Sequence, residues 1–154
     1  MALTSQRAIP LALIVIVALL LAARIVSAFV KTAPAGAVQW LSIEDGMARA
    51  RATNKPILFD FTAEWCGPCH QLDAAVFQNA DFARRINAGF IAVRVVDRQQ
   101  EDGENRPEVA ALQKQYAVRA FPTLVFTDST GNERGRMEGF RGADQFERVM
   151  EQSR

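Results

Sequence analysis

One stretch of the chain constrains its fold more than any other. The apolar run Ile57–Ala63 (ILFDFTA) is followed, two residues later, by Cys66 and then Cys69. A short, almost continuous apolar run is typical of a strand that is buried on both faces of a sheet. Between the cysteines lie Gly67 and Pro68, and proline is well tolerated in the first turn of a helix. The pattern predicts a buried strand leading directly into a helix whose first turn carries both sulfurs.

The remainder of the chain alternates between helical and extended patterns. Ser42 is followed three residues later by Asp45, which resembles a capping box at the start of a helix. Residues 97–106 are polar and contain a glycine, so we expect a loop there. The expected helices are 42–53, 67–77, 81–86, 107–116 and 144–152, and the expected strands 57–63, 90–96, 123–128 and 133–139. This order predicts an α/β fold, a mixed central sheet with helices on both faces.

A long apolar segment precedes this domain. Ala8 to Ala23 carries no charge, and the apolar character resumes after Arg24 and continues to Val30. As one helix, residues 8–30 would be about 34 Å long, enough to cross a bilayer. The chain is therefore expected to comprise an N-terminal tail (1–7), a signal-anchor or transmembrane segment (8–30), a linker (31–39) and a folded domain (40–154).

Two interpretations of the apolar segment remain open. Its length favours an uncleaved membrane anchor, and so do Arg24 and Lys31, which suit the membrane interface. The alternative is a signal peptide cleaved next to small residues, at Ser27–Ala28 or at 35–37. Positive charges lie on both sides of the segment, so they do not define its orientation.

Composition excludes several classes of function. The net charge is +1 and no long block of like charge occurs, so nucleic-acid binding is not expected. With two cysteines and one histidine, the chain lacks ligands for a zinc site of the usual Cys/His kind, and we expect no metal or cofactor. A disulfide across the single C-x-x-C pair would close too short a loop to stabilise the fold much through chain entropy. A chemical role therefore explains the pair better.

The hexapeptide at residues 65–70 (WCGPCH) matches two different signatures. As Cys66-x-x-Cys69-His70 it matches a c-type haem attachment site, with His70 as the axial ligand. As a C-x-x-C pair at the start of a helix it matches a redox dithiol. The neighbouring strands favour the dithiol, because a haem needs a mostly helical surround. A metal-binding electron carrier using the same three residues, and an assembly factor that does not need its cysteines, remain as further alternatives.

Asp60 interrupts the buried strand upstream of the cysteines. An ionised carboxylate is costly inside a sheet, so we expect its pKa to be raised. A dithiol immediately downstream suggests that Asp60 accepts a proton from Cys69.

Pro122 stands at the start of the strand predicted at 123–128. Proline is acceptable at the first position of a strand. A sharper prediction is a cis Phe121–Pro122 peptide bond that packs against the sulfurs.

The joint occurrence of ILFDFTAEWCGPC and, some fifty residues later, YAVRAFPTLVF resembles the thioredoxin family over residues 40–152. The stretches NKPILFDF and VFQNADFARRI are similar to the C-terminal thioredoxin-like domain of bacterial transmembrane disulfide-interchange proteins of the DsbD type. The resemblance implies that Cys66 is the nucleophile, Cys69 the resolving thiol and Asp60 the buried proton acceptor. It also implies a substrate-docking surface formed by Trp65, Gly67, Pro68, Phe121 and the cis-proline Pro122.

The chain also departs from this pattern. Gly67-Pro68 is the dipeptide of cytoplasmic thioredoxins, and His70 replaces a lysine that is frequent after the second cysteine. The lysine that the family places near its buried aspartate has no obvious counterpart, since Arg94 is the only basic residue on its strand. These differences leave the direction of electron flow open.

From the residues and the resemblance together, we predict a membrane-tethered thiol–disulfide oxidoreductase that reduces protein disulfides through Cys66 and Cys69. Its expected partners are disulfide-bonded protein substrates and a membrane electron donor of the disulfide-interchange type. Its expected location is the bacterial inner membrane with the catalytic domain in the periplasm, or the periplasm itself if the signal is cleaved.

Overall fold

The computed structural model of the chain describes Val17 and residues 37–154. The predicted tail (1–7), the apolar segment (8–30) apart from Val17, and residues 31–36 of the linker (31–39) lie outside these residues. Within the described part of the chain, no helix has both the length and the apolar character needed to span a membrane. The predicted anchor is therefore not tested by the structure.

A five-stranded mixed sheet forms the centre of the domain, with strand order β1-β3-β2-β4-β5. The strands β1, β2 and β3 are parallel, whereas β4 runs antiparallel to β2, and β5 antiparallel to β4. Their bounds are β1 Trp40–Leu41, β2 Ile57–Ala63, β3 Ile91–Asp97, β4 Thr123–Thr127 and β5 Glu133–Glu138. The predicted buried strand is β2, at the centre of the sheet.

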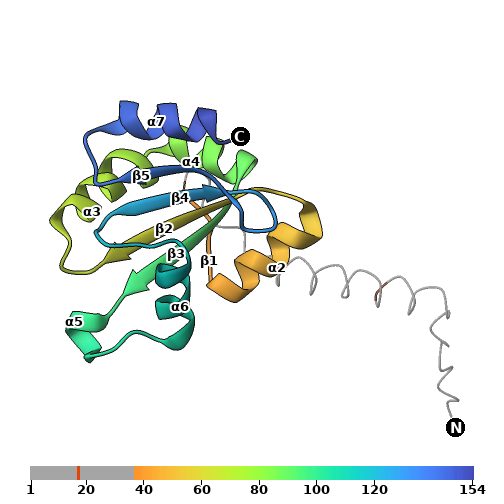
Figure 1. Ribbon diagram of the computed structural model, residues 1–154. Coiled ribbons are helices and arrows are strands. Elements are labelled where there is room, and N and C mark those ends of the chain that lie inside the picture. The colour runs from red at the N-terminus through yellow and green to blue at the C-terminus, as the bar shows by residue number, and fades with distance from the viewer. Residues whose placement is uncertain (1–16, 18–36) are drawn as a thin grey trace, which may run out of the picture. The chain divides into compact units, whose positions relative to one another are not determined.

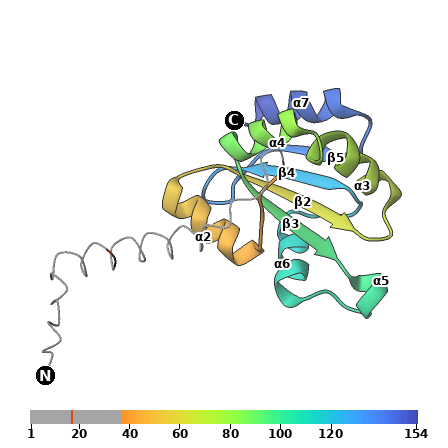
Figure 2. The same cartoon turned by 180° about the vertical axis from the view of Figure 1, so that it is seen from behind.

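Helices cover the sheet on both faces, as the sequence predicted (Figures 1 and 2). One face carries the run α3 and η1 together with α4 and α7, and the other carries α2 and α6. The short α5 lies beyond the end of β3 (Figure 1). The helix bounds are α2 Ile43–Thr53, α3 Gly67–Leu72, η1 Asp73–Phe77, α4 Ala80–Gly89, α5 Gln99–Asp102, α6 Pro107–Gln115 and α7 Ala143–Gln152.

Alternation along the strands separates two apolar cores. Ile57, Phe59 and Phe61 of β2 pack with α2 and α6, whereas Leu58 packs with α4 and α7. Because side chains of a strand alternate between faces, Asp60 shares the face of Leu58. The carboxylate therefore lies on the face covered by α3 and η1, the run of helix that carries Cys69.

The structure differs from the local expectations, or adds to them, at three places. The stretch 97–106 is not only a loop, since it contains the one-turn helix α5, Gln99–Asp102. The predicted helix 67–77 changes at Asp73 from α-helical to π-helical geometry. The strand β1, which is two residues long, was not expected at all. So short a strand has no periodicity to detect, and only its pairing with β3 defines it.

Gly46 lies inside α2, where glycine is normally unfavourable. A Cβ atom at this position would come within 2.2 Å of the Cγ2 atom of Val93, because α2 packs directly on β3. Gly46 therefore permits the close approach of helix and sheet.

We expect Gly46→Ala to destabilise the fold by about 1–3 kcal/mol through overpacking, although alanine is the better helix former. Urea unfolding at equilibrium measures this change. Gly89→Ala is the matched control, since a Cβ there meets only Arg154 at 3.8 Å. If Gly46→Ala were as stable as the control variant, the close contact would have no energetic significance.

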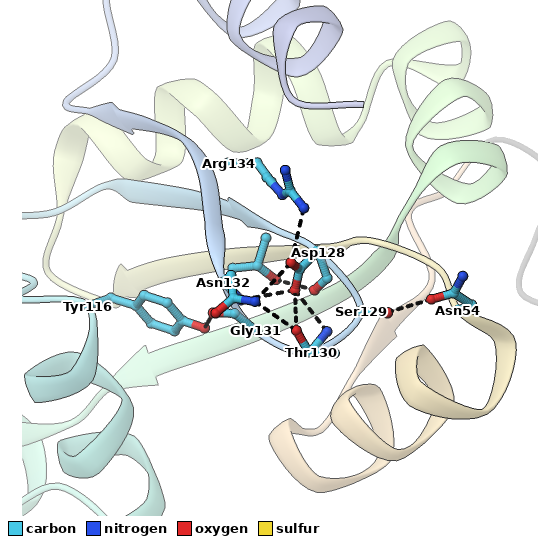
Figure 3. A network of polar contacts seen from close by, with 9 residues as sticks. Asn54, Tyr116, Asp128, Ser129, Thr130, Gly131, Asn132 and Arg134 are labelled. Atoms are coloured by element: carbon cyan, nitrogen blue, oxygen red, sulfur yellow. Dashed lines mark hydrogen bonds and ion pairs between the residues drawn. The ribbon is translucent and has the colours of Figure 1, made fainter.

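The turn between β4 and β5 is held by side-chain hydrogen bonds to Asp128 (Figure 3). Oδ1 of Asp128 accepts hydrogen bonds from the backbone N–H groups of Thr130 and Asn132, at 2.9 and 3.0 Å. Hydrogen bonds from Thr130 and Asn132 lower the pKa of Asp128 below its usual range. Thr127 is in register with Ile57, so this turn lies at the end of the sheet away from the cysteines.

Candidate active site

The two cysteines lie where β2 ends and α3 begins, as predicted. Cys66 is the N-cap residue of α3, and its Sγ atom accepts a hydrogen bond from the backbone N–H of Cys69 at 3.2 Å. The two sulfurs form a disulfide, with 5.3 Å between the Cα atoms. The side chains of Cys66 and Cys69 therefore point toward each other, as a dithiol that cycles between two redox states requires.

The surroundings of the disulfide are partly apolar and partly open. Cys66 is 2 % exposed and Cys69 is 5 % exposed, so both are buried in the oxidised state. Gly67 and Pro68, between the cysteines, are exposed, and so is Trp65, directly before Cys66. Trp65 is the most exposed large apolar residue of the domain, at 50 %.

The Phe121–Pro122 peptide bond is cis, which confirms the prediction. Phe121 packs against the cluster formed by Ala63 and the two cysteines, and its ring makes an edge contact with Trp65 at 5.9 Å between centroids. Thr123, the first residue of β4, pairs with Phe61 near the carboxyl end of β2. The antiparallel pairing of β2 and β4 thus brings two distant sequence segments together at the disulfide.

Asp60 and Arg94 are directly paired in the register of the parallel strands β2 and β3. The Nε atom of Arg94 donates to Oδ2 of Asp60 at 3.0 Å, and its Nη2 atom donates to Oδ1 of Asp73 at 2.7 Å. Oδ1 of Asp60 is buried and has no hydrogen-bond partner within the described part of the chain. Arg94 is thus the basic residue that lies beside the buried aspartate in this chain.

Burial raises the pKa of Asp60 to about 6, although the charge and hydrogen bond of Arg94 oppose the shift. This confirms the expected direction. For Asp73, partial burial also opposes ionisation, but hydrogen bonds from Arg94 and Gln78 outweigh it and lower the pKa. One carboxyl group near the dithiol is therefore poised to exchange a proton near neutral pH, while its neighbour stays ionised.

Asp60 and Cys69 line the same pocket, which has a volume of about 220 Å³. Polar residues lining the pocket include Glu64, His70, Asp73 and Arg94. A space of this size and polarity accommodates water molecules. The pocket thus joins the buried carboxyl group of Asp60 to Cys69.

Glu64 connects the loop between β2 and α3 to two other segments. Its backbone carbonyl accepts a hydrogen bond from Nε2 of His70 at 2.8 Å, so Nε2 of His70 carries a hydrogen. Its carboxylate pairs with Arg98 at 2.6 Å, and Arg98 also pairs with Asp102 of α5. His70 of α3, the residue proposed as an axial ligand in the haem interpretation, is thus hydrogen-bonded to the loop that carries Trp65.

Sequence reasoning missed Asp73, and it noted Arg94 only as the single basic residue of its strand, without giving it a role in the site. Asp73 lies four residues after Cys69, which places both on one helix face. Arg94 is a single charge within an otherwise buried strand, the same signal that singled out Asp60. Both signals were present in the sequence, but their meeting depends on the register of β2 and β3.

The sheet is mixed, and the disulfide lies at a strand–helix junction with a cis-proline beside it and a buried carboxyl group behind it. This fold and site define the class of the protein, a thioredoxin-like thiol–disulfide oxidoreductase. Residues 43–154 match the thioredoxin-like domain family, and the chain belongs to that family. Membership in this family favours the dithiol over haem attachment, because the fold is the sheet-based one that the dithiol interpretation required.

The relatives include disulfide-interchange proteins, which confirms the resemblance stated from the sequence. The thiol:disulfide interchange protein DsbD of Yersinia enterocolitica serotype O:8 is 33 % identical over 101 residues, covering 64 % of this chain and 16 % of that protein. The chain thus matches only about one sixth of the length of this relative.

Solved structures agree with this assignment. The structure of DsbH oxidoreductase superposes with a TM-score of 0.64 at 27 % identity, over 79 % of this chain and 90 % of that one. The oxidised C-terminal domain of Neisseria meningitidis DsbD superposes with a TM-score of 0.57 at 24 % identity, over 75 % and 100 %. The second likeness shows the shared fold alone.

Proposed function

We propose that the chain is a membrane-tethered enzyme that reduces disulfide bonds of other proteins. The observation that carries the proposal is the Cys66–Cys69 disulfide at the start of α3, beside an exposed aromatic surface and above a buried carboxyl group. The similarity to proteins named for thiol–disulfide interchange supports the same chemistry.

The reaction begins with the reduced enzyme. The thiolate of Cys66 attacks one sulfur of the substrate disulfide, so that an enzyme–substrate disulfide forms, the substrate bond breaks and the released sulfur takes up a proton. The N–H of Cys69, which contacts Sγ of Cys66 in the oxidised state, would stabilise this thiolate.

Resolution of the mixed disulfide uses Cys69. Asp60 accepts the proton of the Cys69 thiol through the shared pocket, and the resulting thiolate attacks Sγ of Cys66. The Cys66–Cys69 bond forms, the bond to the substrate breaks, and the second substrate sulfur leaves with the electron pair. Two electrons have then passed from the enzyme to the substrate, and the enzyme is in the oxidised state that the structure describes.

The substrate-docking surface is formed by the five residues that the resemblance implied. Trp65, Gly67 and Pro68 are exposed next to Cys66, the half-buried Phe121 contacts Trp65, and Pro122 is buried directly before β4. An exposed tryptophan beside a reactive sulfur gives an apolar contact for an extended or unfolded substrate segment. Cys66 is buried in the oxidised state, so attack on a substrate requires that its sulfur be accessible in the reduced enzyme.

The apolar segment 8–30 would tether the domain to the bacterial inner membrane, with the domain in the periplasm. A tethered enzyme would stay close to a membrane protein that restores its dithiol, an electron donor of the disulfide-interchange type. The proposal for this segment rests on its length and on the uncharged stretch from residue 8 to residue 23, with Arg24 as its single charge.

The redox state of the dithiol in intact cells tests the proposed direction. We expect acid quenching followed by thiol alkylation to show Cys66 and Cys69 mostly reduced, because the electron donor would keep the dithiol in its reduced form. A mostly oxidised pair would instead indicate an oxidase or isomerase. Labelling with a membrane-impermeant maleimide tests the location, since a reduced dithiol in the periplasm reacts with it in intact cells.

A further inference from the structure

Arg94 lies between two carboxylates and two aromatic rings. Its Cζ atom is 4.1 Å from the ring centroid of Trp40 and 5.4 Å from that of Phe77. The two rings contact each other edge to face, with 4.8 Å between centroids. The guanidinium group that donates to Asp60 and Asp73 is thus also held against aromatic surfaces.

The sheet explains why Trp40 reaches Arg94. Trp40 is in register with Ala92, and Arg94 is two residues further along β3. Side chains two residues apart on a strand point to the same face, so Trp40, Ala92 and Arg94 share one face of the sheet. Asp60 is on that face as well, opposite Arg94 on the other neighbouring strand.

An arginine side chain that is partly exposed loses rotamer freedom when it is held in one position. The side chain of Arg94 is 30 % exposed, so solvent competes for its guanidinium group. Stacking on an indole ring is the strongest of the cation–π contacts, and it restricts a guanidinium group to a plane parallel to the ring. Trp40 therefore favours the orientation in which Nε of Arg94 faces Asp60.

We infer that Trp40 is a positioning residue for the dithiol reaction: its indole ring holds Arg94 against Asp60 and so determines the pH at which Asp60 can accept the proton of Cys69. The inference rests on the proposed role of Asp60. Trp40 itself contacts neither sulfur, and it acts through Arg94. Its place in β1, the two-residue strand at the edge of the sheet, is needed for this contact.

Other charged groups near Asp60 do not replace this contact. Those that line its pocket, besides Arg94, are Asp73 of η1, His70 of α3 and Glu64 of the preceding loop. The negative charge of Asp73 raises the pKa of Asp60, whereas Arg94 lowers it. When Arg94 is released into solvent, burial and Asp73 dominate, and the protonated form of Asp60 becomes more favourable.

The test is the titration of Asp60 in the oxidised full-length chain, monitored by the NMR signal of its carboxyl carbon. We expect Trp40→Leu to shift the midpoint upward by about 0.5–1 pH unit, in the direction set by losing a nearby positive charge. Arg94→Gln should give a larger upward shift. Trp40→Phe should restore part of the wild-type value, because phenylalanine keeps an aromatic face.

Two controls separate positioning from general damage to the fold. Leu41→Ala removes a neighbouring side chain of β1 that packs in the other core, and we expect it to lower stability without moving the titration. In the Arg94→Gln background, Trp40→Leu should cause no further shift, because the two act through one contact. An unshifted Trp40→Leu variant, an equal shift in Leu41→Ala, or an additive shift in the double variant would overturn the inference.

Resolution kinetics distinguish this inference from the proposed function. The rate at which a preformed Cys66 mixed disulfide releases its thiol is measured against pH in the same variants. We expect the midpoint of this profile to move with the titration of Asp60. If the NMR midpoint moves and the rate profile does not, Trp40 positions Arg94 but Asp60 is not the proton acceptor, and the proposed reaction fails at that step.

Discussion

Cys66→Ser is expected to abolish disulfide reduction, with kcat/KM lower by roughly 10³-fold or more, because a neutral hydroxyl group replaces the attacking thiolate. The measurement uses reduced enzyme and a peptide that contains one disulfide, with acid-quenched thiols counted over time. The fold should persist, since Cys66 is one small residue at a helix cap and a serine side chain is also a good N-cap.

Cys69→Ser is the matched control, because it also prevents formation of the disulfide but keeps the nucleophile. We expect this variant to accumulate a covalent enzyme–substrate disulfide, visible as an adduct by mass spectrometry and released by reductant. Full activity of Cys66→Ser would overturn the mechanism and favour an assembly factor that uses only the surface around Trp65. Trapping by Cys66→Ser instead of Cys69→Ser would reverse the roles of the two cysteines.

The second large effect is expected from Asp60→Asn, which keeps the shape of the side chain but removes the proton acceptor. We expect resolution of the mixed disulfide to slow by roughly 10²-fold near neutral pH, the usual contribution of a positioned base. In the wild-type enzyme the resolution rate should rise with pH through about 6, the raised pKa of Asp60. The variant should lack this inflection, and an unchanged profile would exclude Asp60 from proton transfer.

The same variant should be more stable than the wild type at pH 7. The pKa of Asp60 is about 6 in the folded protein and 3.8 as its ordinary value. Because the folded-state pKa is the higher one, the stability that the protonated group contributes is present below pH 4 and is lost as pH rises through 6. Ionising the buried carboxyl group therefore costs about 3 kcal/mol at pH 7.

Asp60→Asn removes this cost, so we expect a gain of about 2–3 kcal/mol at pH 7 and little change at pH 4. Arg94 keeps Asp73 as a partner in the variant. Urea unfolding of the oxidised protein at the two pH values measures the difference. A variant that is less stable at both values would show that Asp60 serves the fold rather than the reaction.

These two variants act on residues that the sequence identified, and the reason lies in local patterns. A buried strand, a C-x-x-C pair and a proline before the next strand each leave a signal within a few residues. The strand predicted at 57–63 matches β2, and the cis Phe121–Pro122 bond was expected from the motif. Short and irregular elements were not predicted, because β1 and α5 are too brief to show a period.

By itself, the sequence determined the strand–helix junction that carries the dithiol, the arrangement of helices on both faces of the sheet and the family to which the chain belongs. Only the tertiary structure decided which charges surround Asp60. Arg94, Asp73 and Trp40 come from separate elements, and their contacts follow from the register of β1, β2 and β3. A shift of one residue would turn these side chains to the opposite face of the sheet. The register therefore determines which charged groups shift the pKa of Asp60.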